Sequence, residues 1–509
     1  MSFAKIQIKE FPQTFWIANT LEIFERMAWY GFFAVSSLYI TGAVSEGGLG
    51  FTDEDRGVLQ GVVTFFLYLF PVVTGALADR YGFKKMLIAA FIVLIPAYYL
   101  LGQVKTFPTF FLAFMLVAIG AAMFKPVIIG TIAKSTNDKT SSMGFGIFYM
   151  MVNIGGFVGP VVAGLVRAMS WEYVFYASSG WMVVNLIIVS IFFKEPEIPN
   201  AAKDVRSLKK VLTDMVEVLG NGRFFLFVFG LLLILVLGSK YTSDGAFTWS
   251  DIILIVIIWI VLNFIIDFIL KKMRNSKNRA WYLTPMKLGD WRFGLFLLLM
   301  SGFWTSFNQI FYTLPLYIRD FTDTTDLLNT IGGVMSFIGL GGLIDSFKNL
   351  MVVPGQINPE YMININAGTI IFFQIGVSYL VTRLKPFTTI FWGVMITVVS
   401  FSILIFGTIG WIVVGGIVVF SFGEMMASPK SKEYTSKIAP PGKVALYMGY
   451  FYWCVALGNL FGGILSGQFY AAFARDMQRP DIMWITFAAI AFASAMLILA
   501  YDKLVIKKK

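Results

Sequence analysis

The sequence contains no histidine and a single cysteine, Cys454, among its 509 residues. Because histidine is the commonest side chain for proton transfer near neutral pH, any proton chemistry must fall to carboxylates in unusual surroundings. One cysteine in an apolar run excludes a disulfide framework and a cysteine metal cluster. The sequence also lacks the phosphate-cradling pattern GxxxxGK[ST]. These absences argue against an enzyme and predict neither a metal site nor a bound cofactor.

Charged residues are scarce as well. They make up 14% of the chain, against about 25% in soluble domains, while 58% is hydrophobic and the mean hydropathy is +0.76. Apolar runs of about 20 residues, the length needed to cross a bilayer, recur along the whole chain. The sequence therefore predicts an all-α polytopic protein embedded in a lipid bilayer. Its first residues, MSFAKIQIKEFPQTFW, lack the layout of a cleaved signal and are expected to form a short cytosolic tail.

The apolar runs give about fourteen candidate membrane spans. They are 12–41, 57–78, 86–102, 107–133, 142–167, 171–193, 224–240, 249–271, 291–318, 358–382, 387–409, 411–432, 444–470 and 481–501. Polar stretches on both sides of 224–240 and 249–271 divide the spans into six, two and six. We expect an N-terminal six-helix bundle over 1–193, basic cytosolic linkers with two additional helices over 194–290, and a C-terminal six-helix bundle over 291–509.

The positions of lysine and arginine predict the orientation, because short cytosolic loops are enriched in them. With the N-terminus inside, roughly 30 of the 40 basic residues fall on the cytosolic side. Both termini are therefore expected in the cytoplasm, in a multi-pass protein of the cell (inner) membrane. The basic residues behind the net charge of +11 are spread over many loops, so they predict no nucleic-acid partner.

Two sets of six helices around a basic linker are typical of an internally duplicated transporter. The loop after the second span, GALADRYGFKK, resembles the loop motif of the major facilitator superfamily through Gly75, Asp79, Arg80 and Gly82. An acid at a helix end beside turn-forming glycines can latch to a neighbouring helix and be released as the halves rock. A plain basic cytosolic turn is the alternative.

The first span carries three ionisable residues, Glu22, Glu25 and Arg26. Each costs about 2.5–3.5 kcal/mol near the bilayer centre, so the three predict a bundle interior or a water-filled cavity. Their spacing of three and four places Glu22 beside both partners on one helical face. Arg26 can neutralise one acid, and the other is then suited to take up a proton. A buried triad that merely packs helices is the alternative.

Three other spans each carry an isolated polar residue, namely Lys125, Asn153 and Glu424. At a helical rise of about 1.5 Å per residue, these side chains lie in nearly the same layer as Glu22. Lys125 is too deep to reach the interface easily, so it needs an anion such as Glu22, Glu424 or a substrate carboxylate. Asn153 fits a helix–helix hydrogen bond equally well.

Glu22-x-x-Glu25-Arg26 resembles the motif of the proton-dependent oligopeptide transporter (POT, or PTR) family within the major facilitator superfamily. Other segments match that family in order along nearly the whole chain. They are Tyr68 in FFLYLFPVVTGALADRYG, Lys125 in MFKPVI, Asn153 in FYMMVNIGG, Phe303 and Trp304, Asn366, GEMMASP with Glu424, and MGYFYWCVALGNLFGG. The resemblance implies two six-helix bundles with the two extra helices of bacterial members. It also implies a monomer that carries di- and tripeptides by proton symport and alternating access.

The resemblance implies roles for individual residues. Proton coupling would involve Glu22, Glu25 and Arg26. Substrate binding would involve Arg26, Tyr30, Tyr68, Lys125, Asn153, Trp304, Asn366, Glu424 and Trp453. The set makes chemical sense, because a zwitterionic peptide needs cations at its carboxylate, an acid at its amino end and tolerant aromatic walls between them.

Two positions depart from the family pattern. Asn308 stands where members commonly have an acid in the seventh span, and Phe33 stands where they have an arginine in the first. Losing both partners of an outer gate pair is energetically consistent, because losing one would leave an unpaired buried charge. Either the outer gate closes by packing, or proton stoichiometry and substrate differ from typical members.

The long apolar, glycine-rich segment 319–357 is expected to be periplasmic and to dip into the membrane or lie on its outer face. A fifteenth membrane span is the alternative. Two other functions also stay open: a major facilitator carrier for another amphoteric or anionic solute, and a peptide receptor that does not transport. Accumulation against a gradient would separate a symporter from a receptor.

Overall fold

The computed structural model describes residues 11–137, 140–195, 220–243, 245, 247–272, 280–287, 289–381, 384–439 and 444–506. Within these ranges the regular secondary structure is helical, apart from one isolated bridge between Asp323 and Ile409. Among the described residues, thirteen helices are long and apolar enough to cross a membrane. The predicted all-α polytopic architecture is therefore confirmed.

The described part of the N-terminal half contains seven α-helices. They are α1 (Gln13–Thr41), α2 (Asp53–Leu69), α3 (Pro71–Tyr81), α4 (Phe83–Gln103), α5 (Phe107–Lys134), α6 (Ser141–Arg167) and α7 (Trp171–Phe192). Helices α2 and α3 together make one span that bends at Pro71. Helix α1 is not among the thirteen because its charged triad lowers its apolar character. It packs against α6 and α7 as the fourteenth long helix.

The remaining helices follow the linker. They are α9 (Gly222–Ser243), α10 (Trp249–Lys272), α11 (Trp291–Phe307), α12 (Gln309–Tyr312), α13 (Leu314–Phe321), α14 (Thr325–Phe337), α15 (Gly341–Lys348), α16 (Pro359–Ile363), α17 (Ile365–Val381), α18 (Pro386–Leu404), α19 (Gly410–Ile438), α20 (Val444–Phe469) and α21 (Pro480–Tyr501), with a π-helix η4 (Tyr470–Asp476) after α20. One interrupted span consists of α11, α12 and α13, and another of α16 and α17.

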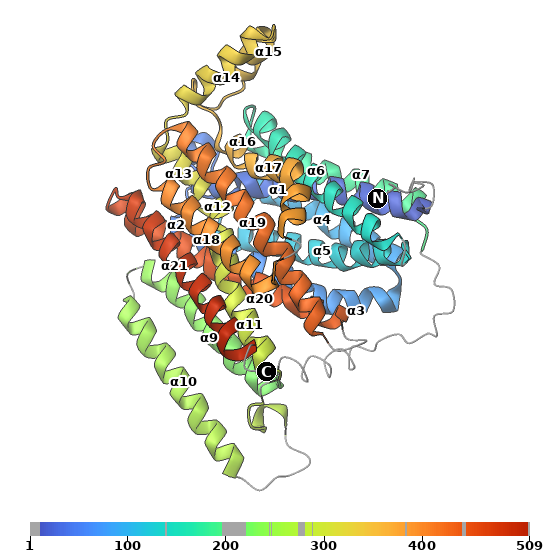
Figure 1. Cartoon of the computed structure of the whole chain (residues 1–509), viewed down its shortest axis with the longest axis vertical. Helices are drawn as coiled ribbons and strands as arrows, with labels where there is room; N and C mark the ends of the chain where they lie inside the picture. Colours follow the sequence, from blue (N-terminus) through green and yellow to red (C-terminus); the bar gives the residue numbers. More distant parts are fainter. Residues whose placement is uncertain are drawn as a thin grey trace.

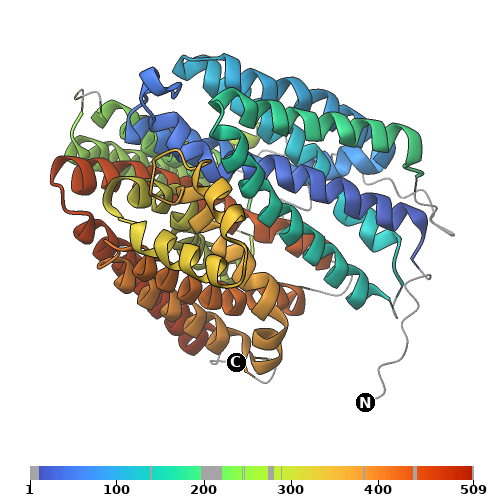
Figure 2. The same cartoon turned by 90° about the horizontal axis from the view of Figure 1, so that it is seen from above.

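Buried apolar side chains form two large cores, one in each half. Phe32 and Phe114 belong to the N-terminal core, and Phe401 and Trp484 belong to the C-terminal core. Seen from above, the blue-to-green N-terminal helices and the yellow-to-red C-terminal helices form two neighbouring groups (Figure 2). A smaller core joins α2, α9 and α20, so these helices connect the halves.

Helices α2 and α20 touch through facing glycines. On α20, a Cβ at Gly463 would lie 2.5 Å from the Cα of Gly61, and one at Gly467 would lie 3.2 Å from the Cα of Gly57. In a membrane, where apolar attraction between helices is weak, such close backbone packing is a main source of association. The contact between the two halves therefore depends on the absence of side chains at these positions.

Replacing Gly463 with alanine is expected to force α2 and α20 apart, because the new methyl group would meet backbone rather than a movable side chain. Overpacking of this kind costs about 1–3 kcal/mol, which should appear as a lower Tm and slower transport. Gly449→Ala is the matched control, since a Cβ at Gly449 in the same helix meets nothing within 4 Å. Equal effects of the two substitutions would contradict the packing argument.

The two additional helices lie at the edge of the bundle, where α10 stands beside α9 (Figure 1). Helix α9 packs across α2 and α20, and Lys240 pairs with Asp55 at 2.5 Å. Trp259 of α10 donates from Nε1 to the carbonyl oxygen of Phe227 at 3.0 Å. Most other side chains of α10 are exposed and apolar, as expected of a helix that faces lipid.

The segment 319–357 forms two short helices, α14 and α15, that extend from the bundle (Figure 1). Their 13 and 8 residues are too few to cross a bilayer, so the alternative of a fifteenth span is wrong. At their base, Gln356 donates to Asp323 at 2.8 Å and accepts from the backbone N–H of Thr324 at 2.7 Å. Hydrogen bonds from Gln356 and Thr325 lower the pKa of Asp323 to about 2. The Asp323 carboxylate, where the two helices join the bundle, therefore stays anionic at physiological pH.

Candidate functional site

A cavity of about 100 Å³ lies between the two halves. Its walls are mostly aromatic or polar. They include five of the predicted site residues: Tyr30, Tyr68, Asn153, Asn366 and Glu424. Five of the nine residues predicted for substrate binding therefore line one cavity, and their roles stay predictions.

The charged triad of α1 lies beside this cavity. Arg26 donates from Nε to Oε2 of Glu25 at 2.5 Å, and the same nitrogen is 3.3 Å from Oε1 of Glu22. All three side chains are buried, and Glu25 is 0% exposed. Oε1 of Glu25 has no hydrogen-bond partner among the described residues. One arginine thus serves two carboxylates, and one carboxylate oxygen is left to accept a proton or a ligand.

Glycines on α6 make room for this triad. A Cβ at Gly155 would lie 2.6 Å from Cβ of Arg26, and one at Gly159 would lie 2.6 Å from the carbonyl oxygen of Met27. The glycines in the sequence NIGGFVG therefore let α6 approach α1 closely. Asn153, just before them, lines the cavity while donating to the carbonyl oxygen of Tyr149 at 2.7 Å.

Lys125 is the second cation near the cavity. Its Nζ lies 4.4 Å from the ring centre of Tyr68, a favourable cation–π arrangement, and it interacts electrostatically with the triad. Pro126 has no N–H, which frees the carbonyl oxygen of Ala122 one turn earlier. Thr74 of α3 donates to that oxygen at 2.6 Å. This contact gives a donor to the carbonyl group that Pro126 leaves free, one turn before Lys125.

Glu424 and Asn366 form the acidic end of the cavity, in the other half. Asn366 donates from Nδ2 to Oε2 of Glu424 and to Oγ of Ser421, both at 3.0 Å. The structure therefore brings together Asn366 and Glu424, which were both predicted to bind the substrate. Cations on α1 and α5 and an acid on α19 flank one cavity from opposite halves.

Two predicted aromatic residues do not line this cavity. Trp304 is buried against Phe303 and Phe307. Trp453 packs on Phe225 of α9, with ring centres 5.3 Å apart. The preceding residue, Tyr452, stacks instead on Tyr68 at 6.2 Å. Adjacent helical residues point about 100° apart, so choosing the wrong member of an aromatic pair directs the side chain away from the site.

The two residues that depart from the family pattern, Phe33 and Asn308, both line the cavity. The ring of Phe33 stacks on that of Trp29, with ring centres 4.9 Å apart, and packs against that of Phe311, with ring centres 6.0 Å apart. Asn308 donates to the carbonyl oxygen of Trp304 at 2.8 Å and is 5% exposed. Helices α1 and α12 therefore meet through aromatic packing here, which supports the first of the two options given by the sequence.

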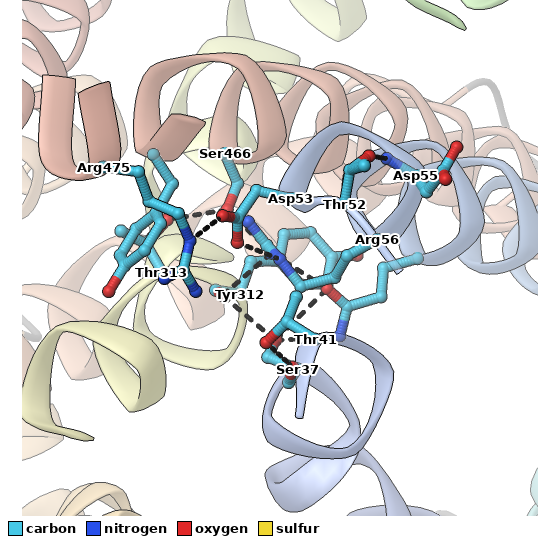
Figure 3. Close-up of polar contacts among 12 residues, drawn as sticks. Ser37, Thr41, Thr52, Asp53, Asp55, Arg56, Tyr312, Thr313, Ser466 and Arg475 are labelled. Atoms are coloured by element: carbon cyan, nitrogen blue, oxygen red, sulfur yellow. Dashed lines mark hydrogen bonds and ion pairs between the residues drawn. The ribbon is translucent and has the colours of Figure 1, made fainter. Parts of the chain in front are cut away.

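Polar contacts between the halves gather near one end of the bundle. We call it the outer end: it holds Thr41 and the start of α2, and the predicted orientation places it outside. Arg56, fully buried, donates from Nη1 to the carbonyl oxygen of Tyr312 and to Oγ of Ser466, both at 3.0 Å. Ser37 donates to the same carbonyl at 3.0 Å. Asp53 lies beside Arg56 and pairs with Arg475 of η4 (Figure 3).

The carbonyl groups at this point are available because the seventh family-type span is broken. Helix α12 ends at Tyr312, and carbonyl groups at a helix C-terminus lack their helical donors. Pro315 also has no N–H to offer to the carbonyl oxygen of Phe311. Ser37 and Arg56 therefore bind backbone carbonyl groups. Such partners cannot be identified from the sequence, because every residue has a carbonyl group.

Arg56→Met is expected to lower the free energy of unfolding by about 1–3 kcal/mol, because it leaves buried acceptors without their donor. The measurement is thermal unfolding of purified protein. Arg479→Met is the control, since Arg479 is exposed at the same end and pairs with Asp481 at 2.7 Å, where an ion pair contributes little. An unchanged Tm for Arg56→Met would contradict a stabilising role for this network.

The predicted latch loop follows α3. Gly82 has a φ of +93°, which favours glycine, and Gly75 faces Pro126. Arg80 is exposed beside Tyr81, and the side chain of Asp79 lies outside the described residues. The anion at the start of α4 is Glu195, which accepts from the backbone N–H of Phe83 at 2.5 Å and of Lys84 at 2.9 Å. The sequence analysis did not identify Glu195. Its place shortly after α7, as an acid beyond the end of a span, could have pointed to such a contact. The latch role stays a prediction.

Comparison with known proteins gives a consistent result. The sequence matches the Major Facilitator Superfamily over residues 20–357. The peptide transporter YePEPT of Yersinia enterocolitica is 24% identical over 94% of this chain and 91% of its own length. The di-/tripeptide transporter of Lactococcus lactis is 22% identical over 66% of this chain and 74% of its own length.

A solved structure of a POT family transporter in complex with a thioalcohol conjugated peptide has the same fold. The TM-score is 0.68 at 18% identity, with 97% of this chain and 99% of that chain covered. The resemblance predicted from the motifs is confirmed, and these relatives are transporters rather than enzymes. The relatives named above are described as peptide or di-/tripeptide transporters, and the chain itself belongs to the major facilitator superfamily.

Proposed function

We propose that the protein is a secondary active transporter that carries di- and tripeptides together with protons by alternating access. The relatives named above are peptide transporters, which supports the substrate class. The lipid bilayer surrounds the helices, and peptides and protons are the transported partners. We further propose a monomer in the cell (inner) membrane with both termini in the cytoplasm.

The observation that carries the proposal is the charge distribution around one cavity. Arg26 and Lys125 provide cations on the N-terminal side, while Glu424, held by Asn366, provides an acid on the C-terminal side. A zwitterionic peptide placed between them offers a carboxylate to the cations and an ammonium group to the acid. Since the two ends bind opposite halves, substrate binding would draw the halves together.

The triad supports proton coupling. Glu22 and Glu25 share Arg26, so a substrate carboxylate that also binds Arg26 would compete with them. A carboxylate that loses its cation in a buried site is stabilised by taking up a proton. Substrate binding and proton binding would then favour each other, as symport requires.

The proposal is tested by the Tm and by exchange of labelled dialanine across proteoliposome membranes. Unlabelled dialanine should raise the Tm and support exchange, whereas N-acetyl-dialanine and dialanine amide should do neither, because each lacks one charged end. Equal effects of all three compounds would show that the charged ends are not recognised. No effect of any of them would favour a carrier for another amphoteric or anionic solute.

A further inference from the structure

A second cavity lies at the outer end of the protein, and we call it the outer cavity. Its volume of about 1110 Å³ is large enough for a small peptide, whereas the cavity that contains Glu424, the central cavity, has about 100 Å³. Its wall includes the turn between α6 and α7 in one half and the segment before α16 in the other. Met169 in this wall is exposed, so a ligand can enter from the outer side.

Asn358 places a hydrogen-bond donor without a partner in the wall of the outer cavity. Its Oδ1 accepts from the backbone N–H of Val352 at 3.0 Å. Since a backbone N–H can only donate, this contact fixes which end of the side-chain amide is the oxygen. The other end, Nδ2, has no hydrogen-bond partner among the described residues, although Asn358 is only 3% exposed. A buried donor without an acceptor is unfavourable, so Asn358 favours a ligand that brings an acceptor.

Arg167, the last residue of α6, provides a cation in the same wall. Its guanidinium group lies 4.6 Å from the ring centre of Trp171 and donates from Nη1 to Oε2 of Glu360 at 2.8 Å. A guanidinium group has five N–H groups, so it can bind a second carboxylate while it keeps the first. Glu360 follows Asn358 by two residues, which places the remaining N–H groups of Arg167 and Nδ2 of Asn358 at the same end of α16.

Glu172 adds an acid to the outer cavity. It follows Trp171 in α7, is exposed and has no ion pair with any described residue. The indole ring of Trp171 and the side chains of Val352 and Val353 supply apolar surface in the same wall. A free peptide presents the complementary groups, namely a carboxylate, an ammonium group and side chains between them.

We propose that the outer cavity is a second peptide-binding site, in which Asn358 and Arg167 hold the carboxylate of a peptide and Glu172 holds its ammonium group. The proposal rests on the proposed function, since it takes the same class of substrate. It adds a place where peptide collects at the outer end before it reaches the central cavity.

The outer site is tested with an environment-sensitive dye at Met169. Met169 is changed to cysteine in a Cys454→Ala background, which removes the only native cysteine, and the labelled full-length protein is studied in nanodiscs. Dialanine should change the emission of the dye in a saturable way, which gives a Kd. A dye at Phe406 is the control and should not respond, because Phe406 is exposed at the outer end but does not line the cavity.

Asn358→Asp should raise this Kd about tenfold or more. Aspartate can still accept from Val352, so the substitution removes the donor and adds a charge that repels the peptide carboxylate. Glu172→Gln should raise the Kd for dialanine but not that for N-acetyl-dialanine, which has no ammonium group. Val353→Trp fills the outer cavity from an exposed position and should weaken both ligands, so it covers the case in which Asn358→Asp fails to fold.

A dye at Met169 that does not respond to dialanine would overturn the proposal, and so would a Kd that Asn358→Asp or Val353→Trp leaves unchanged. An equal rise in Glu424→Gln would also overturn it, because the dye would then report binding in the central cavity. Exchange of labelled dialanine separates this failure from failure of the proposed function. Exchange without a dye response would overturn the outer site alone, whereas a dye response without exchange would overturn the transporter alone.

Discussion

Replacing Glu25 with glutamine is expected to abolish the accumulation of peptide driven by a proton gradient, while exchange of peptide across the membrane continues. Glutamine keeps the shape of the side chain but cannot gain and lose a proton. Arg26 retains Glu22 at 3.3 Å as a counter-charge, so the cation needed to bind a substrate carboxylate stays in place. The measurement compares driven uptake with exchange in the same proteoliposomes.

Glu46→Gln is the control for this substitution, because Glu46 is exposed at the outer end of the protein and should not affect either assay. Driven uptake that survives Glu25→Gln would show that the triad does not couple the proton. Loss of exchange together with driven uptake would mean that Glu25 is needed to hold Arg26 for binding.

Replacing Glu424 with glutamine is expected to raise the KM for dialanine about 10- to 100-fold, with a much smaller change in kcat. The substitution removes a charge-assisted hydrogen bond to the peptide ammonium group, which contributes about 1.5–3 kcal/mol, and 1.4 kcal/mol corresponds to a factor of ten. Glutamine can still accept a hydrogen bond from Nδ2 of Asn366, which lies 3.0 Å from Oε2 of Glu424 in the parent protein. The wall of the cavity should therefore keep its shape.

Ser421→Ala tests whether the effect comes from the charge. Ser421 accepts from the same amide group of Asn366 at 3.0 Å but is itself neutral and buried, so its loss should change the KM much less. The preference for dialanine over N-acetyl-dialanine, measured by their KM values, should be smaller in Glu424→Gln than in the parent. An unchanged KM for dialanine would show that Glu424 does not bind the amino end.

Residues whose cost in a membrane is high could be predicted from the sequence. Glu25, Arg26 and Glu424 stand out because a charge within an apolar run needs a partner or a cavity, and all three lie in or beside the cavity. The helical architecture could be predicted for the same reason, since only helices satisfy the backbone within one apolar segment.

The outer end could not be predicted. Arg56 binds a backbone carbonyl 256 positions away, and Arg167 pairs with Glu360 across 193 positions. Backbone acceptors leave no side-chain pattern, and pairs so distant are known only once the helices are placed. The position of the Trp453 side chain could not be predicted for a related reason. Which face of α20 meets the cavity depends on where α2 and α9 pack.

Uptake of labelled dialanine into proteoliposomes, with an inward proton gradient imposed and then collapsed by an ionophore, tests the central claim most directly. The account predicts that peptide accumulates above its outside concentration while the gradient lasts and leaks back to equality when it is collapsed. Peptide that enters only to equality under both conditions would contradict proton coupling. Peptide that does not enter at all would contradict the substrate assignment.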